Sequence, residues 1–244
     1  MKITQKLKTS FLAFGVLGLL VSCSDDDTSD SLSPDQGRLS IAAMATYQPG
    51  VADKTSRNGS LELSSFKVNF TEIELEFDDI IDDDNFYDSD DDVELEGPFE
   101  MDLLSGTPME FVNLELPNGR LEEIEFEFDK SIDTESLMHN KSMMMEGSIN
   151  GTPFVFWHDF EEEIELEFEA GDENSIISHD HNSVVINFDL NAVFNLDSSV
   201  DLSTAVDGNG DGLIEISPED EDGNQDLAEE IKEAIKDQID LLED

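Results

Sequence analysis

Cysteine, tryptophan and basic residues are scarce in this chain. Its 244 residues include one Cys, one Trp, two Tyr and 12 Lys or Arg, against 61 Asp or Glu. A single cysteine excludes an intrachain disulfide. The formal net charge of −49 repels phosphate backbones, which excludes nucleic acid as a partner and favours attraction to cations. The sequence has no nucleophile elbow, Cys–His pair or phosphate-binding glycine-rich loop, so it offers no recognisable reaction centre.

The N-terminus has the composition of a secretory leader. Three lysines within the first eight residues precede the apolar segment 11–21, which is too short to span roughly 30 Å of hydrocarbon as a helix. Residues 1–22 are therefore predicted to be a signal peptide. The run Leu20-Val21-Ser22-Cys23 resembles the bacterial lipobox, so we expect cleavage before Cys23 and lipidation of its thiol. The alternative is an ordinary signal peptide with a chance cysteine.

An acidic run follows the predicted lipidation site. It resembles the export signal that some Gram-negative bacteria use to place lipoproteins on the outer leaflet, and it consists of Ser24, Asp25, Asp26 and Asp27. The predicted localisation is therefore the outer membrane, lipid-anchored and exposed at the cell surface. The alternative is a solvated acidic tether. Residues 23–36 lack an apolar pattern and are predicted to be a lipidated, disordered tether.

Alternation of apolar and acidic residues dominates residues 37–196. Segments 71–77, 123–128 and 163–168 each place Ile, Leu or Phe on one side and glutamate on the other, as a strand with one buried face requires. Turn signals occur at 117–119 and at Asn150-Gly151. Further strand candidates are 38–44, 61–70, 99–103, 110–116, 142–149, 153–157 and 184–194. The pattern predicts an all-β chain folded as an antiparallel β-sandwich.

The outward glutamates pose an electrostatic problem. Unit charges about 5 Å apart repel by roughly 0.8 kcal/mol even at the dielectric constant of water. Either the three glutamate strands are not neighbours, or the protein works in a salty, calcium-containing medium that screens them. The aspartate-rich segment 78–92 is predicted to be a solvated loop, with a low-affinity divalent-cation site as the alternative.

Several short motifs resemble a known family. They are Gly37-Arg38-Leu39-Ser40-Ile41, Phe99-Glu100-Met101-Asp102-Leu103-Leu104, and Leu114-Glu115-Leu116-Pro117-Asn118-Gly119-Arg120 followed by Ile124. Over about residues 37–195 the chain resembles domain of unknown function family 4382, a bacterial lipoprotein-associated family. It departs where Ala43-Met44-Ala45-Thr46 replaces the family's Thr-Asp-Ala-Pro. The resemblance implies a β-sandwich in a lipoprotein, and no established activity.

The clearest chemical motif lies near the C-terminus. Residues 207–215 match the first nine positions of an EF-hand loop, in which oxygen ligands at alternate positions bind one Ca²⁺. Position twelve is Pro218, where a bidentate Glu is expected. The alternative is a metal-free turn, and the acidic turn 220–224 offers further ligands. The predicted calcium ligands are Asp207, Asn209, Asp211, the carbonyl of Leu213, Glu215 and Glu219.

A helix is predicted after Asn224, completing the segment 197–244. Apolar residues recur there at helical spacing, with Asp226 as the expected N-cap, and they are Leu227, Ile231, Ile235, Ile239 and Leu242. A single apolar stripe needs a covering surface. We expect the helix to pack on its own sandwich, and the alternative is docking onto another protein.

Taken together, these patterns predict a non-enzymatic, surface-anchored lipoprotein. Its β-sandwich would serve as a binding or structural module stabilised by Ca²⁺. One alternative is an accessory subunit of an outer-membrane uptake or adhesion complex, and a hydrolase is less favoured because its motifs are missing. The predicted partners are the membrane, through the lipid on Cys23, divalent cations, and a protein contacting the C-terminal helix.

Overall fold

The structure is a computed structural model that describes residues 36–49, 60–77, 92–168, 176–177, 181–195 and 197–242. These residues belong to one compact unit. The predicted signal peptide, Cys23 with its tether, and segment 78–91 lie outside the described residues. None of the helices within the described ranges has the length and apolar character needed to cross a bilayer.

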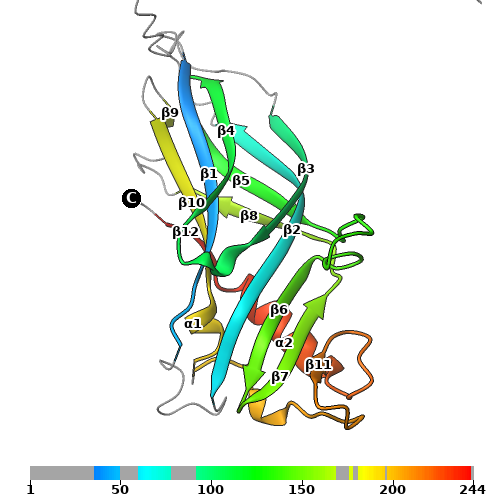
Figure 1. The fold of residues 1–244 in the computed structure, drawn as a ribbon. Coiled ribbons are helices and arrows are strands. Elements are labelled where there is room, and N and C mark those ends of the chain that lie inside the picture. Colours follow the sequence, from blue (N-terminus) through cyan, green and yellow to red (C-terminus); the bar gives the residue numbers. More distant parts are fainter. Residues whose placement is uncertain are drawn as a thin grey trace, which may run out of the picture. The chain divides into compact units, whose positions relative to one another are not determined.

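Two β-sheets make up most of the structure (Figure 1). The four-stranded sheet has the order β12-β10-β1-β4. Its strands are β1 (Gln36–Thr46), β4 (Met109–Pro117), β10 (His181–Asp189) and β12 (Ile239–Leu242). The eight-stranded sheet has the order β11-β7-β6-β2-β5-β8, with β3 paired to β2 and β9 paired to β5. Its strands are β2 (Leu61–Phe77), β3 (Val93–Asp102), β5 (Gly119–Phe128), β6 (Met143–Ile149), β7 (Thr152–His158), β8 (Glu162–Glu167), β9 (Ile176–Ile177) and β11 (Ile214–Ile216).

The long strand β2 organises the larger sheet. Its first half pairs with β6, and its second half pairs with both β3 and β5. Residues 70–75 of β2 pair with β3 on one edge and with β5 on the other, and residues 67–68 of β2 pair with β3 and with β6. The strands β5 and β6 therefore follow each other along the same edge of β2. This arrangement leaves β3, β2, β5 and β8 as four consecutive neighbours (Figure 1).

Phenylalanines join the two sheets through one core. Phe188 of β10 meets Phe66 of β2 at 5.5 Å between ring centroids, and it also contacts Phe70 and Phe128. All four rings are fully buried. Burial of large aromatic side chains is the main favourable contribution here, because each removes a large apolar area from water.

The mainly β character predicted from the sequence is confirmed, but the sheets are mixed rather than antiparallel throughout. β1 pairs with β10 in parallel, and β11 pairs with β7 in parallel. Alternation does not distinguish the two directions, because both place alternate side chains on opposite faces. The predicted hairpin at Asn150-Gly151 is confirmed, with φ values of 52° and 82° that suit a tight turn. The other predicted turn, at 117–119, connects β4 of the four-stranded sheet with β5 of the eight-stranded sheet.

Several strand and helix ends differ from the sequence prediction. The predicted strand 184–194 ends at Asp189, whose side chain accepts the N–H of Ala192 and starts the short helix α1 (Leu190–Val193). The predicted C-terminal helix is α2 (Gln225–Lys236), and its N-cap is Asn224 rather than Asp226. The last two apolar positions of the predicted helical stripe, Ile239 and Leu242, belong instead to β12, which pairs with β10. Short 3₁₀ helices occupy η2 (Leu103–Ser105) and η3 (Leu202–Thr204).

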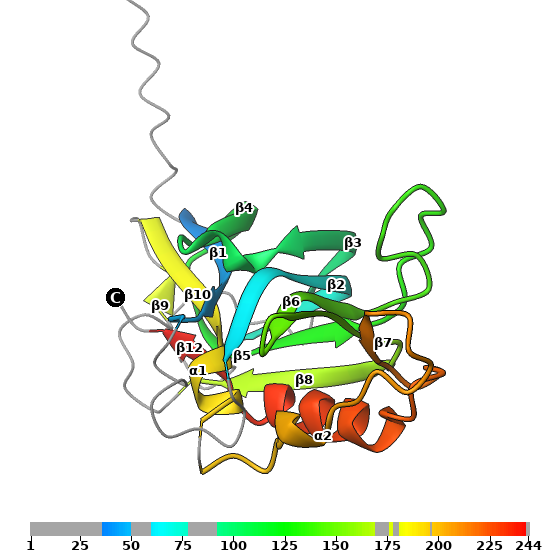
Figure 2. The ribbon, with the colours of Figure 1, turned by 60° about the horizontal axis from the view of Figure 1, so that its bottom comes forward.

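Helix α2 packs against β7, β11 and α1 (Figure 2). Its apolar stripe joins the core through Leu227, Ala228, Ile231, Ala234 and Ile235. The chain itself therefore covers this stripe, as the sequence analysis expected. The predicted contact between this helix and another protein stays a prediction.

Candidate functional site

Acidic side chains from four adjacent strands form one outward surface, which we call the glutamate face. β3, β2, β5 and β8 place their glutamates directly opposite one another. One row contains Glu96, Glu72, Glu127 and Glu163, the next contains Glu94, Glu74, Glu125 and Glu165, and the third contains Glu76, Glu123 and Glu167. The three predicted glutamate strands are thus direct neighbours, with β5 between β2 and β8.

The inner residues of these strands explain why the glutamates point outward. Ile73, Leu75, Ile124 and Phe126 alternate with the glutamates and are almost completely buried in the core. A strand spacing of about 4.8 Å and a repeat of about 6.7 Å along each strand then set the distances between carboxylates. Burial of the inner side therefore produces a regular grid of acids on the outer side.

Crowding changes the protonation of this grid. Burial, together with a hydrogen bond to Glu163 and repulsion from that group, raises the pKa of Glu125 from 4.5 to about 7. Burial and neighbouring acids also raise the pKa of Glu74, Glu76 and Glu123. Part of the glutamate face therefore holds protons at a pH where isolated glutamates are charged.

Three sets of acids on this face could hold a metal ion. Within each set the carboxylate oxygens lie within 4.8 Å of one another, and the sets are Glu74/Glu76/Asp92, Glu76/Glu123/Glu125 and Glu125/Glu163/Glu165. One carboxylate oxygen of Glu123 is buried without a hydrogen-bond partner. A hollow of about 160 Å³ lies beside Glu125 and Glu163. Hard cations such as Ca²⁺ bind oxygen ligands of this kind, completed by water.

The predicted calcium loop is held together by its own acidic side chains. The carboxylate of Asp207 accepts the backbone N–H groups of Gly210, Asp211 and Gly212 at 2.7 to 3.1 Å. The carbonyl of Asn209 accepts the N–H of Asp211 at 2.9 Å. Asp207 Oδ1 accepts two of these N–H groups, whereas Asp207 Oδ2 and Asn209 Oδ1 accept one each and keep a second lone pair that a cation could use.

The remaining predicted ligands are spread over the end of the loop. Glu215 lies in β11, where its carboxylate accepts the indole N–H of Trp157 at 3.1 Å. Leu213 and Glu219 are exposed, and Ile214 is buried as the EF-hand pattern predicts. Within the described part of the chain, the carboxylates of Asp207, Asp211, Glu215 and Glu219 do not gather into a cluster like those of the glutamate face. The loop's calcium binding stays a prediction.

Two buried aspartates have a role that sequence reasoning missed. Asp222 accepts the N–H groups of Asn209 and Glu215 at 3.0 and 2.8 Å, which fixes both ends of the loop. Asp220 accepts the N–H groups of Gly223 and Asn224 at the start of α2. The sequence suggested this turn as a source of further metal ligands, whereas its carboxylates bind backbone donors. The tendency of Asp to bond nearby backbone N–H groups was the available signal.

An ion-pair network around the buried side chains of His158 and Lys232 connects α2 to the larger sheet. His158 Nδ1 accepts the N–H groups of Asp159 and Phe160, so the ring proton lies on Nε2 and is donated to Glu229 at 3.0 Å. The ammonium of Lys232 lies 2.9 Å from carboxylates of Glu229 and Glu233. Burial acts to lower the pKa of Lys232, but these hydrogen bonds outweigh it and raise the pKa. The network fixes the position of α2.

Comparison with protein-family models, with curated protein sequences and with solved structures found no match to this chain. The resemblance to family 4382 therefore stays a prediction.

Proposed function

We propose that the protein is a non-enzymatic lipoprotein, anchored in the outer membrane through Cys23 and displayed on the cell surface. Its β-sandwich would bind divalent cations, with Ca²⁺ as the preferred ion, and would be stabilised by them. The observation that carries this proposal is the alignment of glutamates across β3, β2, β5 and β8. Each neighbouring pair of charged carboxylates costs roughly 0.8 kcal/mol, and a bound cation replaces that repulsion with attraction.

The arrangement of carboxyl groups favours cation binding over hydrolysis. A glycosidase needs two carboxyl groups about 5 to 9 Å apart, so that the scissile bond fits between them. Glu125, the group with the most strongly raised pKa, instead shares a hydrogen bond with Glu163. A carboxyl pair in direct contact leaves no room for a substrate bond, but it is the geometry in which one cation can bridge two ligands.

The loop 207–215 supplies a second proposed Ca²⁺ site of EF-hand-like character. Its preformed turn keeps Asp207, Asn209 and Asp211 close together through backbone hydrogen bonds. Glu215 would join them, and Glu219 would need to move toward the loop. This site would brace the end of the larger sheet, because the last two residues of the loop begin β11, which pairs with β7.

Calcium titration of a charge-reduced glutamate face tests the proposal. The unlipidated chain, with residues 1–22 removed and Cys23→Ser, is titrated with CaCl₂ by isothermal calorimetry. The triple variant Glu76→Gln, Glu123→Gln and Glu125→Gln removes every ligand of one cluster and one ligand from each of the other two. We expect it to lose most of the heat of binding, because the remaining acids of the face no longer form those clusters.

A matched control separates specific ligands from overall charge. The variant Glu62→Gln, Glu146→Gln and Glu230→Gln removes the same number of charges away from the glutamate face. Glu62 and Glu146 lie opposite serines of neighbouring strands, and Glu230 is exposed on α2. Equal calcium binding by both triple variants would contradict a site on the glutamate face.

Lipidation and surface display need experiments on cells. Labelled palmitate should enter the mature protein and should be absent from the Cys23→Ser variant. Protease treatment of intact cells should degrade the protein, and chelation of calcium should speed that degradation. Protection of the protein in intact cells, with or without chelator, would contradict surface display.

One feature favours the second candidate function, an accessory subunit of an uptake or adhesion complex. Ile132 and Leu137 are 83% and 63% exposed in the loop that joins β5 to β6. A backbone hydrogen bond from Ser131 to Lys141 closes the loop, and Met138 is fully buried beneath it. The two exposed apolar side chains on such a closed loop offer a small contact surface for a partner protein. The variant Ile132→Ser/Leu137→Ser should lose any stoichiometric partner recovered from intact cells.

A further inference from the structure

Strand β8 is the last strand of the eight-stranded sheet, and among the described strands only β5 pairs with it (Figure 1). Just beyond β8, the N–H of Phe168 donates to the carbonyl of Glu122 at 2.9 Å, in the register that β8 follows. Alternate residues of an antiparallel pair exchange hydrogen bonds with the neighbouring strand. Residues 164 and 166 therefore bond to β5, and the backbone N–H and C=O groups of residues 163, 165 and 167 point away from it. None of the described strands lies on that side.

The two faces of β8 differ in character. Its three outward glutamates are exposed and continue the rows of the glutamate face. Its inward side chains, Ile164 and Leu166, are only half-buried, although their partners Phe126 and Ile124 in β5 are almost completely buried. The core is therefore incompletely covered along this edge, and one more strand would cover it.

The charge of β8 decides which strands its edge admits. An exposed strand edge favours pairing with other chains, and proteins commonly block it with proline, lysine or a bulge. The edge strand β3 contains Pro98, which has no N–H to donate, whereas β8 contains neither proline nor lysine. Pairing of two β8 edges would place glutamates opposite glutamates across the new ladder, which disfavours a second copy of this chain. The same glutamates favour a strand of opposite charge.

We propose that the edge of β8 binds an extended polypeptide segment in which Lys or Arg alternates with apolar residues. The segment would pair with the backbone groups of residues 163, 165 and 167 as an added strand, a general mode of peptide recognition. Its basic side chains would lie beside the three outward glutamates, and its apolar side chains would cover Ile164 and Leu166. Strand pairing supplies contacts that calcium binding lacks, so this proposal does not depend on the proposed calcium sites.

Amide hydrogen exchange of the unlipidated chain, followed by NMR, tests the proposal. The probe is the acetylated and amidated peptide Lys-Val-Lys-Val-Lys-Val-Lys, titrated in EDTA so that calcium plays no part. We expect saturable shifts in β8 and new protection from exchange at the N–H groups of Glu163, Glu165 and Glu167. The N–H groups of residues 164 and 166 already bond to β5, so attraction between charges alone would not produce this alternation. Absence of the alternating protection overturns the proposal.

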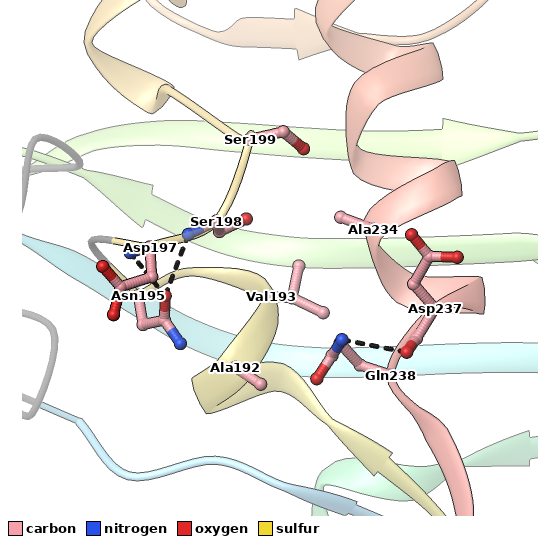
Figure 3. Close-up of a pocket in the computed structure, with 9 residues that line it drawn as sticks. All are labelled: Ala192, Val193, Asn195, Asp197, Ser198, Ser199, Ala234, Asp237 and Gln238. Atoms are coloured by element: carbon pink, nitrogen blue, oxygen red, sulfur yellow. Dashed lines mark hydrogen bonds between the residues drawn. The ribbon is translucent and has the colours of Figure 1, made fainter.

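A scrambled peptide of the same composition, Lys-Lys-Val-Val-Lys-Lys-Val, is the matched control ligand. It keeps the charge and breaks the alternation, so it should produce no alternating protection. A hollow of about 280 Å³ between the segment after α1 and the end of α2 supplies an internal control (Figure 3). It is flanked by the exposed acids Asp197 and Asp237, whose carboxylates do not converge (Figure 3), so its amide signals should not shift. Equal shifts in the hollow and in β8 would overturn the proposal.

Two substitutions at one position separate backbone pairing from charge. Glu165→Gln removes one carboxylate and keeps the N–H, so it should weaken peptide binding by about 1.5- to 5-fold. Glu165→Pro removes the same carboxylate together with the outward N–H, so it should weaken binding by a further factor of about 2 to 12. An edge strand tolerates proline where the N–H points away from the ladder. Equal affinities of the two folded variants would overturn the proposal.

Modified peptides test the same hydrogen bonds without changing the chain. One peptide is methylated on its valine nitrogens and another on its lysine nitrogens, and the one whose blocked nitrogens face β8 should lose binding. Retained binding by both peptides would reject strand pairing. Glu167 belongs to none of the three acid clusters, so Glu167→Gln should weaken peptide binding and leave calcium binding unchanged. Peptide binding and calcium binding can therefore fail independently.

Discussion

Replacing Glu125 by glutamine should stabilise the protein at alkaline pH and have little effect at acidic pH. In the folded chain the pKa of Glu125 is raised from 4.5 to about 7 by burial and by contact with Glu163. The folded state therefore binds a proton that the unfolded state has released, between about pH 4.5 and 7. The stabilisation from this proton is complete below pH 4.5 and is lost as the pH rises through 7. Glutamine mimics the protonated form at every pH.

The size of the effect follows from the pKa and from solvent screening. A pKa raised from 4.5 to about 7 corresponds to roughly 3 kcal/mol if it acted in full. The side chain is partly exposed, so water and salt screen the repulsion, and we expect a gain of about 1 kcal/mol at pH 8. For a chain of this size, that gain raises the melting temperature by about 2 to 4 °C.

Urea unfolding at several pH values, in EDTA and followed by fluorescence of the single tryptophan, measures this gain. Glu146→Gln is the matched control, because Glu146 occupies a strand of the same sheet opposite Ser65 and Val155 rather than other acids. The Glu125→Gln advantage should grow with pH, and the control should show no such trend. With saturating Ca²⁺ the order should reverse, since the wild-type carboxylate then has a cation to bind. A Glu125→Gln variant less stable than wild type at pH 8 in EDTA would refute the reasoning.

Three further changes should have distinct effects. Gly147→Ala places a Cβ 2.0 Å from the backbone oxygen of Glu62, so it should separate β6 from β2 and destabilise the chain by about 3 kcal/mol or more in urea unfolding. Lys232→Met leaves the half-exposed glutamates around it without their cation, and it should lower the free energy of unfolding by about 1 kcal/mol at pH 7, with a smaller loss once acid protonates those glutamates. Calcium binding to the loop 207–215 should change the fluorescence of Trp157, because the indole N–H of Trp157 donates to the carboxylate of Glu215. Asp207→Ala should abolish that change. A fluorescence response that survives in this variant would exclude the loop as its source.

Local sequence patterns predicted the strands because each strand has one buried face. Ile73 and Leu75 of β2, and Ile124 and Phe126 of β5, are buried at the alternate positions that the pattern requires. The same rule places the glutamates between them on the outer side. The Asn150-Gly151 turn was predictable for a separate reason, because both residues tolerate positive φ.

Strand order, strand direction and the end of α2 depend on contacts distant in sequence. β1 and β10 lie far apart along the chain, and no short turn fixes their relative direction. Ile239 continues the helical spacing of Ile231 and Ile235, so periodicity alone assigns it to the helix. After α2, however, the chain reaches the edge of β10, and Ile239 pairs with Phe188 of that strand as part of β12. A gain from tertiary pairing thus overrides local propensity.

The glutamate face is difficult to explain as a requirement of folding. Sliding β2, β5 or β8 by two residues would keep the buried faces buried, and it would still set glutamate against glutamate, because all three strands repeat the same alternation. Segments 71–77, 123–128 and 163–168 contain no lysine or arginine that could relieve the repulsion. Threonine or glutamine at the outer positions would form the same strands without repulsion. A surface that lowers stability without serving the fold points to a ligand of opposite charge, and multivalent cations match its spacing and its hard oxygen donors.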